Sequence, residues 1–101
     1  MNVTLRQLRV FLSVAQRGNF SRAGDHIGLT QPAISRAIVE LELQLGLKLL
    51  DRTTREVVLT EAGQSLKVRV GRLIEELDQT LQDVAGLVQS RAGKVRVASS
   101  P

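Results

Sequence analysis

Residues 29–42 read LTQPAISRAIVELE and combine two different faces in one helical segment. On a helical wheel, the apolar positions form one narrow stripe that consists of Ile34, Ile38, Leu41 and Leu45. Ser35 and Arg36 fall on the opposite side, which is small, polar and basic. A helix that only filled a core would have little use for such a face, so we expect the face to contact something outside the domain.

Both ends of this helix are marked in the sequence. Thr30 can cap its N-terminus, and Pro32 falls in the first turn, where its missing N–H and fixed φ cost nothing. Gly46 follows the last apolar residue, and glycine adopts the left-handed conformation of a helix end without a steric penalty. We therefore predict a helix over residues 31–45.

Two further helices precede it. Thr4 can cap the first, which ends near Gly18 and carries Phe11 beside an apolar stripe of Leu5, Leu8, Leu12 and Ala15. Ser21 can cap the second, over residues 21–27, and Gly28 can end it. A tight glycine turn then leads into the helix of residues 31–45.

A hairpin and a long helix follow. Residues 49–52 and 56–59 are β-prone runs joined by a polar tip, which predicts a two-stranded hairpin. Thr60 can cap a helix over residues 61–90, in which apolar residues recur every three or four positions: Leu66, Val70, Leu73, Leu77, Leu81, Val84 and Val88. At about 1.5 Å per residue this helix is longer than so small a domain can cover, so we expect the seam to pair with a second copy.

Composition limits the classes of function. The chain has 101 residues, enough for one small domain, and its 43% hydrophobic and 24% charged residues are typical of a soluble globular protein. It has no membrane-length apolar run and no signal-peptide layout, so we expect a cytoplasmic protein that binds no membrane. With no cysteine and one histidine, His26, we expect no metal site. A catalytic serine needs a group that activates it, and the sequence offers no second histidine, no lysine in an apolar segment and no Gly-rich nucleophile elbow. We therefore expect no enzyme.

Positive charge is concentrated in the first part of the chain. The formal net charge is +4, and residues 1–60 contain eight of the 14 Lys and Arg residues but five of the 10 acids. A basic balance alone is a weak sign of an anionic partner. It gains weight here because the polar face of residues 31–45 lies in the same region.

The order of the predicted elements indicates a fold. Helix, short helix, glycine turn, helix and hairpin form a winged helix-turn-helix, so the fold class is mostly α: three helices and a two-stranded wing, followed by a long helix. In this motif the second helix enters the DNA major groove, where Gln can pair with adenine, Arg with guanine, and Ser with a base or a phosphate. Residues 31–45 are thus predicted to be the recognition helix.

The segment NFSRAGDHIGLTQPAISRAIVELELQLGLKLLDRTTREVVLTEAG resembles the DNA-binding region of LysR-type transcriptional regulators, and the resemblance covers residues 3 to about 90. It includes Thr30-Gln31-Pro32, the Leu41-Glu42 pair and the Leu59-Thr60-x-x-Gly63 entry to the long helix. It implies a bacterial regulator in which paired linker helices form a homodimer and two winged heads read an interrupted palindrome in double-stranded DNA. It further implies association with the nucleoid, a C-terminal effector domain that binds a small-molecule inducer, and tetramers of the full-length protein.

The resemblance also implies a domain division and a set of DNA-binding residues. Residues 1–60 would form the DNA-binding head, residues 61–90 the dimerisation linker, and residues 91–101 a hinge and the first strand of the effector domain. The chain itself would hold no cofactor. The residues expected to contact DNA are Ser21, Arg22, Thr30, Gln31, Pro32, Ser35 and Arg36 from the helices, and Arg52, Thr53, Thr54 and Arg55 from a wing over residues 52–56 that touches the backbone or the minor groove.

Plainer interpretations stand beside these. The outer face of residues 31–45 could be only solvated, residues 52–55 an ordinary hairpin tip, and Ser21 a simple cap. The basic head could instead dock an acidic protein. Two positions depart from the family pattern: Gly24 replaces an alanine, which should loosen its helix by up to ~1 kcal/mol, and Leu50 replaces a phenylalanine. Leu43 also faces outward, where a contact with a neighbouring element is the one role that the pattern suggests.

Overall fold

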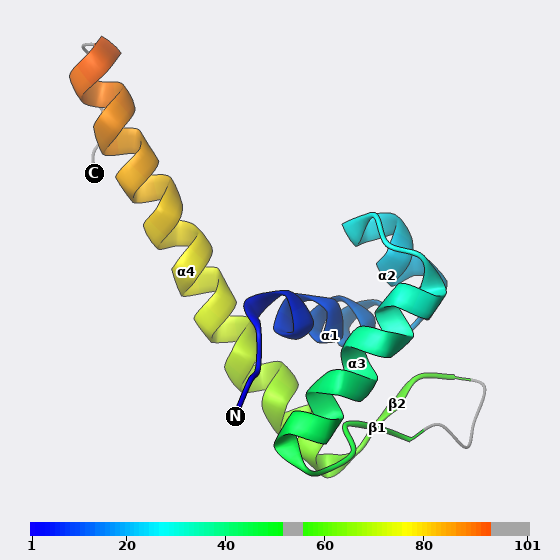
Figure 1. Ribbon diagram of the computed structural model, residues 1–101. Helices are drawn as coiled ribbons and strands as arrows, with labels where there is room; N and C mark the ends of the chain where they lie inside the picture. Colours follow the sequence, from blue (N-terminus) through cyan, green and yellow to red (C-terminus); the bar gives the residue numbers. More distant parts are fainter. Residues whose placement is uncertain (52–55, 94–101) are drawn as a thin grey trace. The chain divides into compact units, whose positions relative to one another are not determined.

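The computed structural model describes residues 1–51 and 56–93, with side chains up to residue 87. Its elements, in chain order, are α1 (Leu5–Arg17), α2 (Phe20–Ile27), α3 (Gln31–Leu45), β1 (Leu50–Asp51), β2 (Val58–Leu59) and α4 (Glu61–Gly93) (Figure 1). This order confirms the mostly α class with a two-stranded wing and a long final helix. The chain forms two compact units, residues 1–71 and 72–101, and α4 contributes residues to both.

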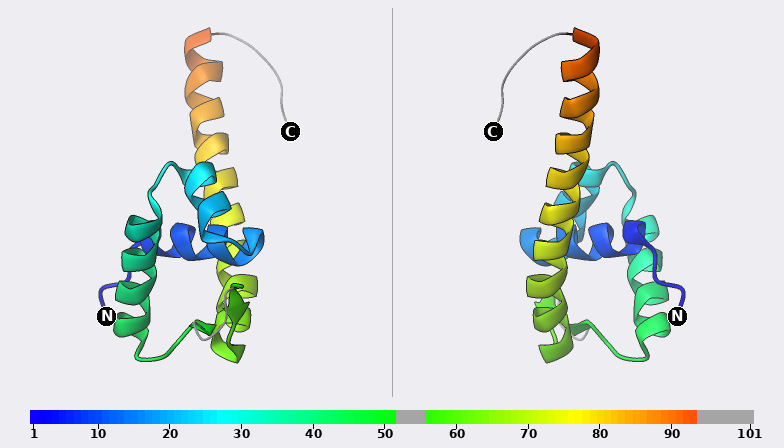
Figure 2. Two further views of the ribbon diagram at one scale, coloured as in Figure 1. Left: turned by 90° about the vertical axis from the view of Figure 1, so that its right-hand side faces the viewer. Right: turned by 90° about the vertical axis from the view of Figure 1, so that its left-hand side faces the viewer.

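The core of the first unit lies where α1, α2 and α3 meet. Each of these helices contacts the other two, and α3 runs across α1 in Figure 2. The fully buried side chains from α3 are Ile34, Ile38 and Leu41, which confirms the predicted inward stripe. Burying an aliphatic side chain of this size contributes about 1.5–3 kcal/mol, so this stripe fixes which face of α3 remains outside.

The predicted stripe of α1 is partly wrong. The buried residues are the consecutive run from Val10 to Val14, in which Phe11 is fully buried, whereas Leu5 is 44% exposed. Five consecutive helical residues span more than one full turn, so the middle of α1 is covered on all sides. A helix surrounded in this way has no single apolar face, and periodicity misplaces its core contacts.

The helix ends follow the predicted chemistry with one correction. Thr4 and Thr30 cap α1 and α3, and Gly18, Gly28 and Gly46 adopt positive φ where α1, α2 and α3 end. Ser21 does not cap α2. Asn19 does, because its Oδ1 accepts a hydrogen bond from Arg22 N at 3.0 Å, and the helix begins at Phe20.

The connection between α3 and β1 is organised by Glu42, a carboxylate that is only 4% exposed. Its Oε2 accepts hydrogen bonds from Leu49 N at 2.7 Å and from Leu50 N at 3.2 Å. Its backbone carbonyl accepts from Gly46 N and Leu47 N, which closes the end of α3. Glu42 therefore holds both sides of the turn that leads from α3 into the wing.

The wing sheet is shorter than predicted. In place of runs over residues 49–52 and 56–59, the paired residues are Leu50 with Leu59 and Asp51 with Val58 in antiparallel register. Leu50 is buried although it is smaller than the phenylalanine expected there. The tip, residues 52–55, lies outside the described residues.

A single residue, Thr60, connects β2 to α4. Thr60 N donates to Leu49 O, and the Thr60 hydroxyl donates to Lys48 O at 2.7 Å while accepting from Gly63 N at 3.0 Å. A Cβ atom built on Gly63 would overlap the carbonyl oxygen of Leu49. Glycine is thus required where α4 crosses the chain before β1. Helix α4 continues to Gly93 rather than ending at residue 90, and the rest of the predicted hinge and first strand, residues 94–101, lies outside the described residues.

The substitution Gly63→Ala should destabilise the protein by about 1–3 kcal/mol, because the new methyl group meets a backbone carbonyl that cannot move freely. Gly86→Ala is the matched control on the same helix. A Cβ there meets nothing within 4 Å, so the substitution should stabilise by up to about 1 kcal/mol through helix propensity. Urea unfolding followed by circular dichroism measures both, and equal effects would contradict this account of Gly63.

The substitution Glu42→Ala should cost about 2–5 kcal/mol, because it leaves the buried amides of Leu49 and Leu50 without their acceptor. Glu40→Ala removes an exposed carboxylate two residues away and should change the free energy of unfolding by no more than about 0.5 kcal/mol. The same unfolding experiment compares them. A small loss for Glu42→Ala would show that water replaces the carboxylate.

Candidate nucleic-acid interface

The outer face of α3 carries the polar residues that the sequence singles out. Gln31, Pro32 and Arg36 are exposed, and Ser35 is half-buried. Because the apolar stripe of α3 is fully buried, these side chains cannot turn inward, and they project from a rigid element. A straight helix with a small, polar outer face has the dimensions that fit a DNA major groove.

The first turn of α3 is nearly closed by its own cap. The Thr30 hydroxyl accepts from Ala33 N at 3.3 Å, Thr30 O accepts from Ile34 N at 3.0 Å, and Pro32 has no N–H. Within the described part of the chain, the Gln31 N–H is therefore the one amide of this turn that keeps no partner. Thr30 has a structural role as a cap, and its O–H is still able to donate.

Helix α2 presents Ser21 and Arg22 on its exposed first turn, where the Arg22 amide is held by Asn19. The other end of α2 packs tightly against the turn into α3. A Cβ built on Gly24 would lie 2.5 Å from Leu29 O and 3.4 Å from Ile34 Cδ1. Glycine at this position therefore allows a closer approach of the two helices than alanine would, which outweighs its weak helix propensity.

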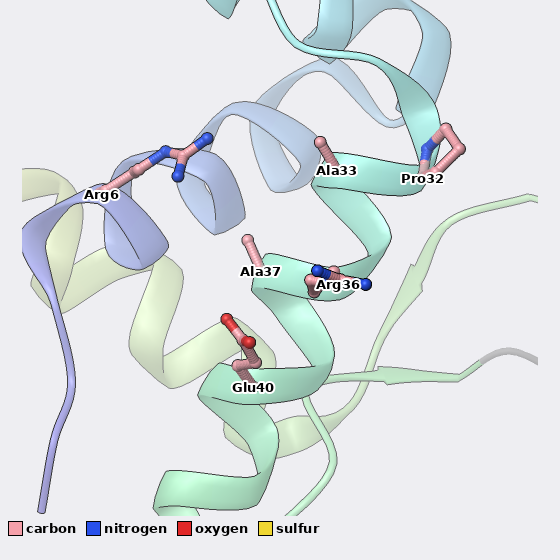
Figure 3. Close-up of a pocket in the computed structure, with 6 residues that line it drawn as sticks. All are labelled: Arg6, Pro32, Ala33, Arg36, Ala37 and Glu40. Atoms are coloured by element: carbon pink, nitrogen blue, oxygen red, sulfur yellow. The ribbon is translucent and has the colours of Figure 1, made fainter.

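Arg6 is a charged residue near this face that the sequence analysis missed. Together with α3, the first turns of α1 border a groove lined by Arg6, Pro32, Ala33, Arg36, Ala37 and Glu40 (Figure 3). The available signal was the pair of alanines four residues apart, since small side chains at that spacing let another element approach one edge of a helix. Nothing in the periodicity of α1 indicated that Arg6 points that way.

Leu43 continues the outer face beyond Arg36 and is 73% exposed. The expected contact with a neighbouring element is therefore wrong for the part of the chain that the structure describes. Val39, between them on the same face, is also exposed. The second half of this face thus carries two exposed apolar side chains, Val39 and Leu43, beside the exposed carboxylate of Glu40.

The predicted dimerisation seam divides into two parts. Leu66 and Val70 belong to the first unit, where Leu66 packs against the core and Val70 is 5% exposed, so these two residues are used within the chain. In the second unit, Leu73, Leu81 and Val84 are exposed and Leu77 is half-buried. The side chain of Val88 lies outside the described residues. Leu87, which was not predicted, is also exposed.

The remaining predicted site residues, Arg52, Thr53, Thr54 and Arg55, lie outside the described residues, so their role stays a prediction. In residues 1–51 and 56–93, no helix is both long and apolar enough to cross a membrane. Among the same residues, no group of three His, Asp or Glu side chains could hold a metal ion.

Comparison with known proteins identifies the fold. The family model for the bacterial regulatory helix-turn-helix protein, lysR family, matches residues 5–64. An uncharacterized HTH-type transcriptional regulator, YfeR of Shigella flexneri, is 57% identical over 100 residues, which cover 99% of this chain and 32% of that protein. The chain thus spans about a third of the length of that relative.

Solved structures agree with this match. The DNA-binding domain of BenM in complex with catB site 1 DNA superimposes with a TM-score of 0.80 at 33% identity, over 84% of this chain and 96% of that one. A hydrogen-peroxide-bound OxyR C206S mutant from Corynebacterium glutamicum gives a TM-score of 0.79 at 34% identity, over 85% of this chain and 28% of that one. The chain therefore belongs to the LysR family of bacterial regulatory helix-turn-helix proteins, and its fold is the DNA-binding domain of that family.

Proposed function

We propose that this chain binds double-stranded DNA sequence-specifically as a homodimer, with α3 in the major groove and the wing, residues 52–56, on the backbone or in the minor groove. The observation that carries the proposal is the small, polar and basic outer face of α3, held outward by a fully buried apolar stripe on a scaffold whose relatives are solved with DNA bound. The chain acts by binding rather than by catalysis, in keeping with relatives that are transcriptional regulators.

Base recognition comes from the first half of α3. The Gln31 amide suits the N6 and N7 edge of adenine, and the Arg36 guanidinium suits the O6 and N7 edge of guanine. Ser35 binds either a base or a phosphate. Pro32 and Ala33 carry no long side chain, so the helix backbone can come close to the base edges, and their carbon atoms offer a surface for thymine methyl groups.

Phosphate contacts come from the flanking elements. Ser21 and Arg22, on the exposed first turn of α2, suit one backbone strand. The Gln31 N–H and the Thr30 hydroxyl suit a phosphate at the start of α3, where the helix dipole favours negative charge. Arg52, Thr53, Thr54 and Arg55 of the wing add further contacts to the backbone or the minor groove. These contacts position the head and carry no sequence information.

Dimerisation uses the exposed part of the seam. Leu73, Leu81, Val84 and Leu87 are large apolar side chains left in contact with solvent by the described residues, and such rows mark interaction surfaces. Val88 extends the row in the sequence. Pairing α4 with its copy brings two heads together, which fits an operator with two matched half-sites, an interrupted palindrome.

The remaining proposals concern the longer protein. Residues 1–60 form the head, residues 61–90 the linker and residues 91–101 the hinge to an effector domain, although α4 continues to Gly93. Support comes from relatives three times as long as this chain, one of which is solved with hydrogen peroxide bound. A small-molecule inducer would thus act on a domain outside this chain, which also supplies tetramer contacts. The protein acts at the nucleoid, in the cytoplasm.

Selection from a random duplex pool tests sequence recognition. The 101-residue chain should enrich an interrupted palindrome. Arg36→Ala should cost about 1–3 kcal/mol for the selected site and relax the preference at one base pair of each half-site. Gln31→Ala and Ser35→Ala should alter the preferred site, whereas Arg55→Ala should weaken all duplexes about equally.

Retention of duplexes without regard to sequence, unaffected by Arg36→Ala, would contradict base recognition by α3. It would favour a basic head that docks an acidic protein instead. The reverse pattern, in which Arg55→Ala changes the preferred site and Arg36→Ala weakens all duplexes alike, would exchange the roles of wing and helix.

The substitution Val84→Asp should dissociate the dimer, because it places a charge in the apolar seam of α4. Sedimentation velocity at micromolar concentration measures the mass of the particle. Val68→Asp is a matched control, since Val68 is 52% and Val84 53% exposed on the same helix, but Val68 lies off the seam. Equal dissociation by both variants, or by neither, would contradict pairing through the seam.

A further inference from the structure

Arg6 and α3 border a groove of about 380 Å³ at the edge of the proposed DNA-binding face. Figure 3 shows the Arg6 side chain extending from α1 toward the first turns of α3, with the methyl groups of Ala33 and Ala37 between the two helices. Pro32 and Arg36 border the groove on the α3 side. The floor is therefore small and apolar, and the two cations stand on opposite sides of it.

The described residues do not neutralise the charges of this groove. Arg6, Arg36 and Glu40 are all exposed, and within residues 1–51 and 56–87 none of them forms an ion pair or a side-chain hydrogen bond. Two guanidinium groups against one carboxylate leave a net positive groove. An arginine without a protein partner beside a small apolar floor has the chemistry of an oxyanion-binding group, because its planar fork matches phosphate oxygens in a bidentate manner.

We propose that Arg6 binds a backbone phosphate of the DNA strand that borders the major groove, while Arg36 faces the bases. This inference rests on the proposed function of α3. A major groove is about 12 Å wide and a helix with its side chains about 10–12 Å across, so α3 fills it. A side chain that reaches α3 from another helix, along its edge, therefore meets the wall of the groove, and that wall is the phosphate backbone.

Glu40 sets the strength of this contact. Its carboxylate lies one helical turn after Arg36 in the same groove, where it repels a phosphate that Arg6 holds. The groove thus combines one attractive group from α1 with one repulsive group from α3. Affinity for DNA in general is lower than the two arginines alone would give, which leaves a larger share of the binding energy to base contacts.

The test uses the 101-residue chain, a duplex carrying its selected site and a scrambled duplex, titrated over a range of salt concentrations. Arg6→Gln should weaken both duplexes severalfold by the same factor and reduce the slope of log K against log salt by about one. Arg6→Lys should keep the slope, since it keeps the charge. Glu40→Gln should strengthen both duplexes. Arg69→Gln, an exposed arginine of α4 outside the groove, should leave affinity and slope unchanged.

Three results would overturn the proposal. If the Arg6→Gln variant binds DNA with the same affinity and salt slope as the Arg69→Gln variant, Arg6 does not contact DNA. If the Arg6→Gln variant prefers a different site, Arg6 contacts a base instead of a phosphate. Unchanged affinity in Glu40→Gln would place the phosphate outside the groove. Circular dichroism melting confirms that each variant is folded. The chain without substitutions tests the proposed function separately. If it binds the selected and the scrambled duplex equally well, the proposed sequence-specific binding is wrong, whatever the variants show.

Discussion

The buried carboxylate of Glu42 is the interaction on which the arrangement of the first unit depends. A charged group in a core is costly unless it is hydrogen-bonded, and one carboxylate oxygen of Glu42, Oε2, accepts from two backbone amides just before and within β1. Because the same residue closes the end of α3 through its own carbonyl, one position fixes both the C-terminal end of α3 and the start of the wing. The apolar stripe of α3 then determines which face of the helix packs against the core.

The two faces of α3 consequently have different surroundings. Ile34, Ile38 and Leu41 hold the helix to the core, and the opposite face is left to partners. Gln31 and Arg36 are exposed in the N-terminal half of α3, and the exposed apolar side chains Val39 and Leu43 lie in the C-terminal half beside Glu40. Arg6 of α1 and Arg22 of α2 are exposed and add positive charge to the surface of the first unit.

Local signals predicted the fold well, and contacts between elements were predicted poorly. Caps, glycine ends and the stripe of α3 depend on neighbours within a few residues, and these expectations were confirmed for Thr30, Gly46 and Ile34. The cap assigned to Ser21 was wrong because Asn19, two residues earlier, accepts from Arg22 N, so the helix begins at Phe20 and Ser21 lies inside its first turn. The core face of α1 was misplaced because several elements surround it. Arg6 was missed since its position depends on how α1 crosses α3, which one sequence without relatives does not reveal.

The first turn of α4 and the base of the wing form one rigid unit. Thr60 is hydrogen-bonded to Lys48 and Leu49, and the backbone of Gly63 packs against Leu49. A rotation of this turn about the helix axis would therefore move the base of the hairpin by the same angle. Torque on α4, and not only distance along it, is thus a quantity that would change the orientation of β1 and β2.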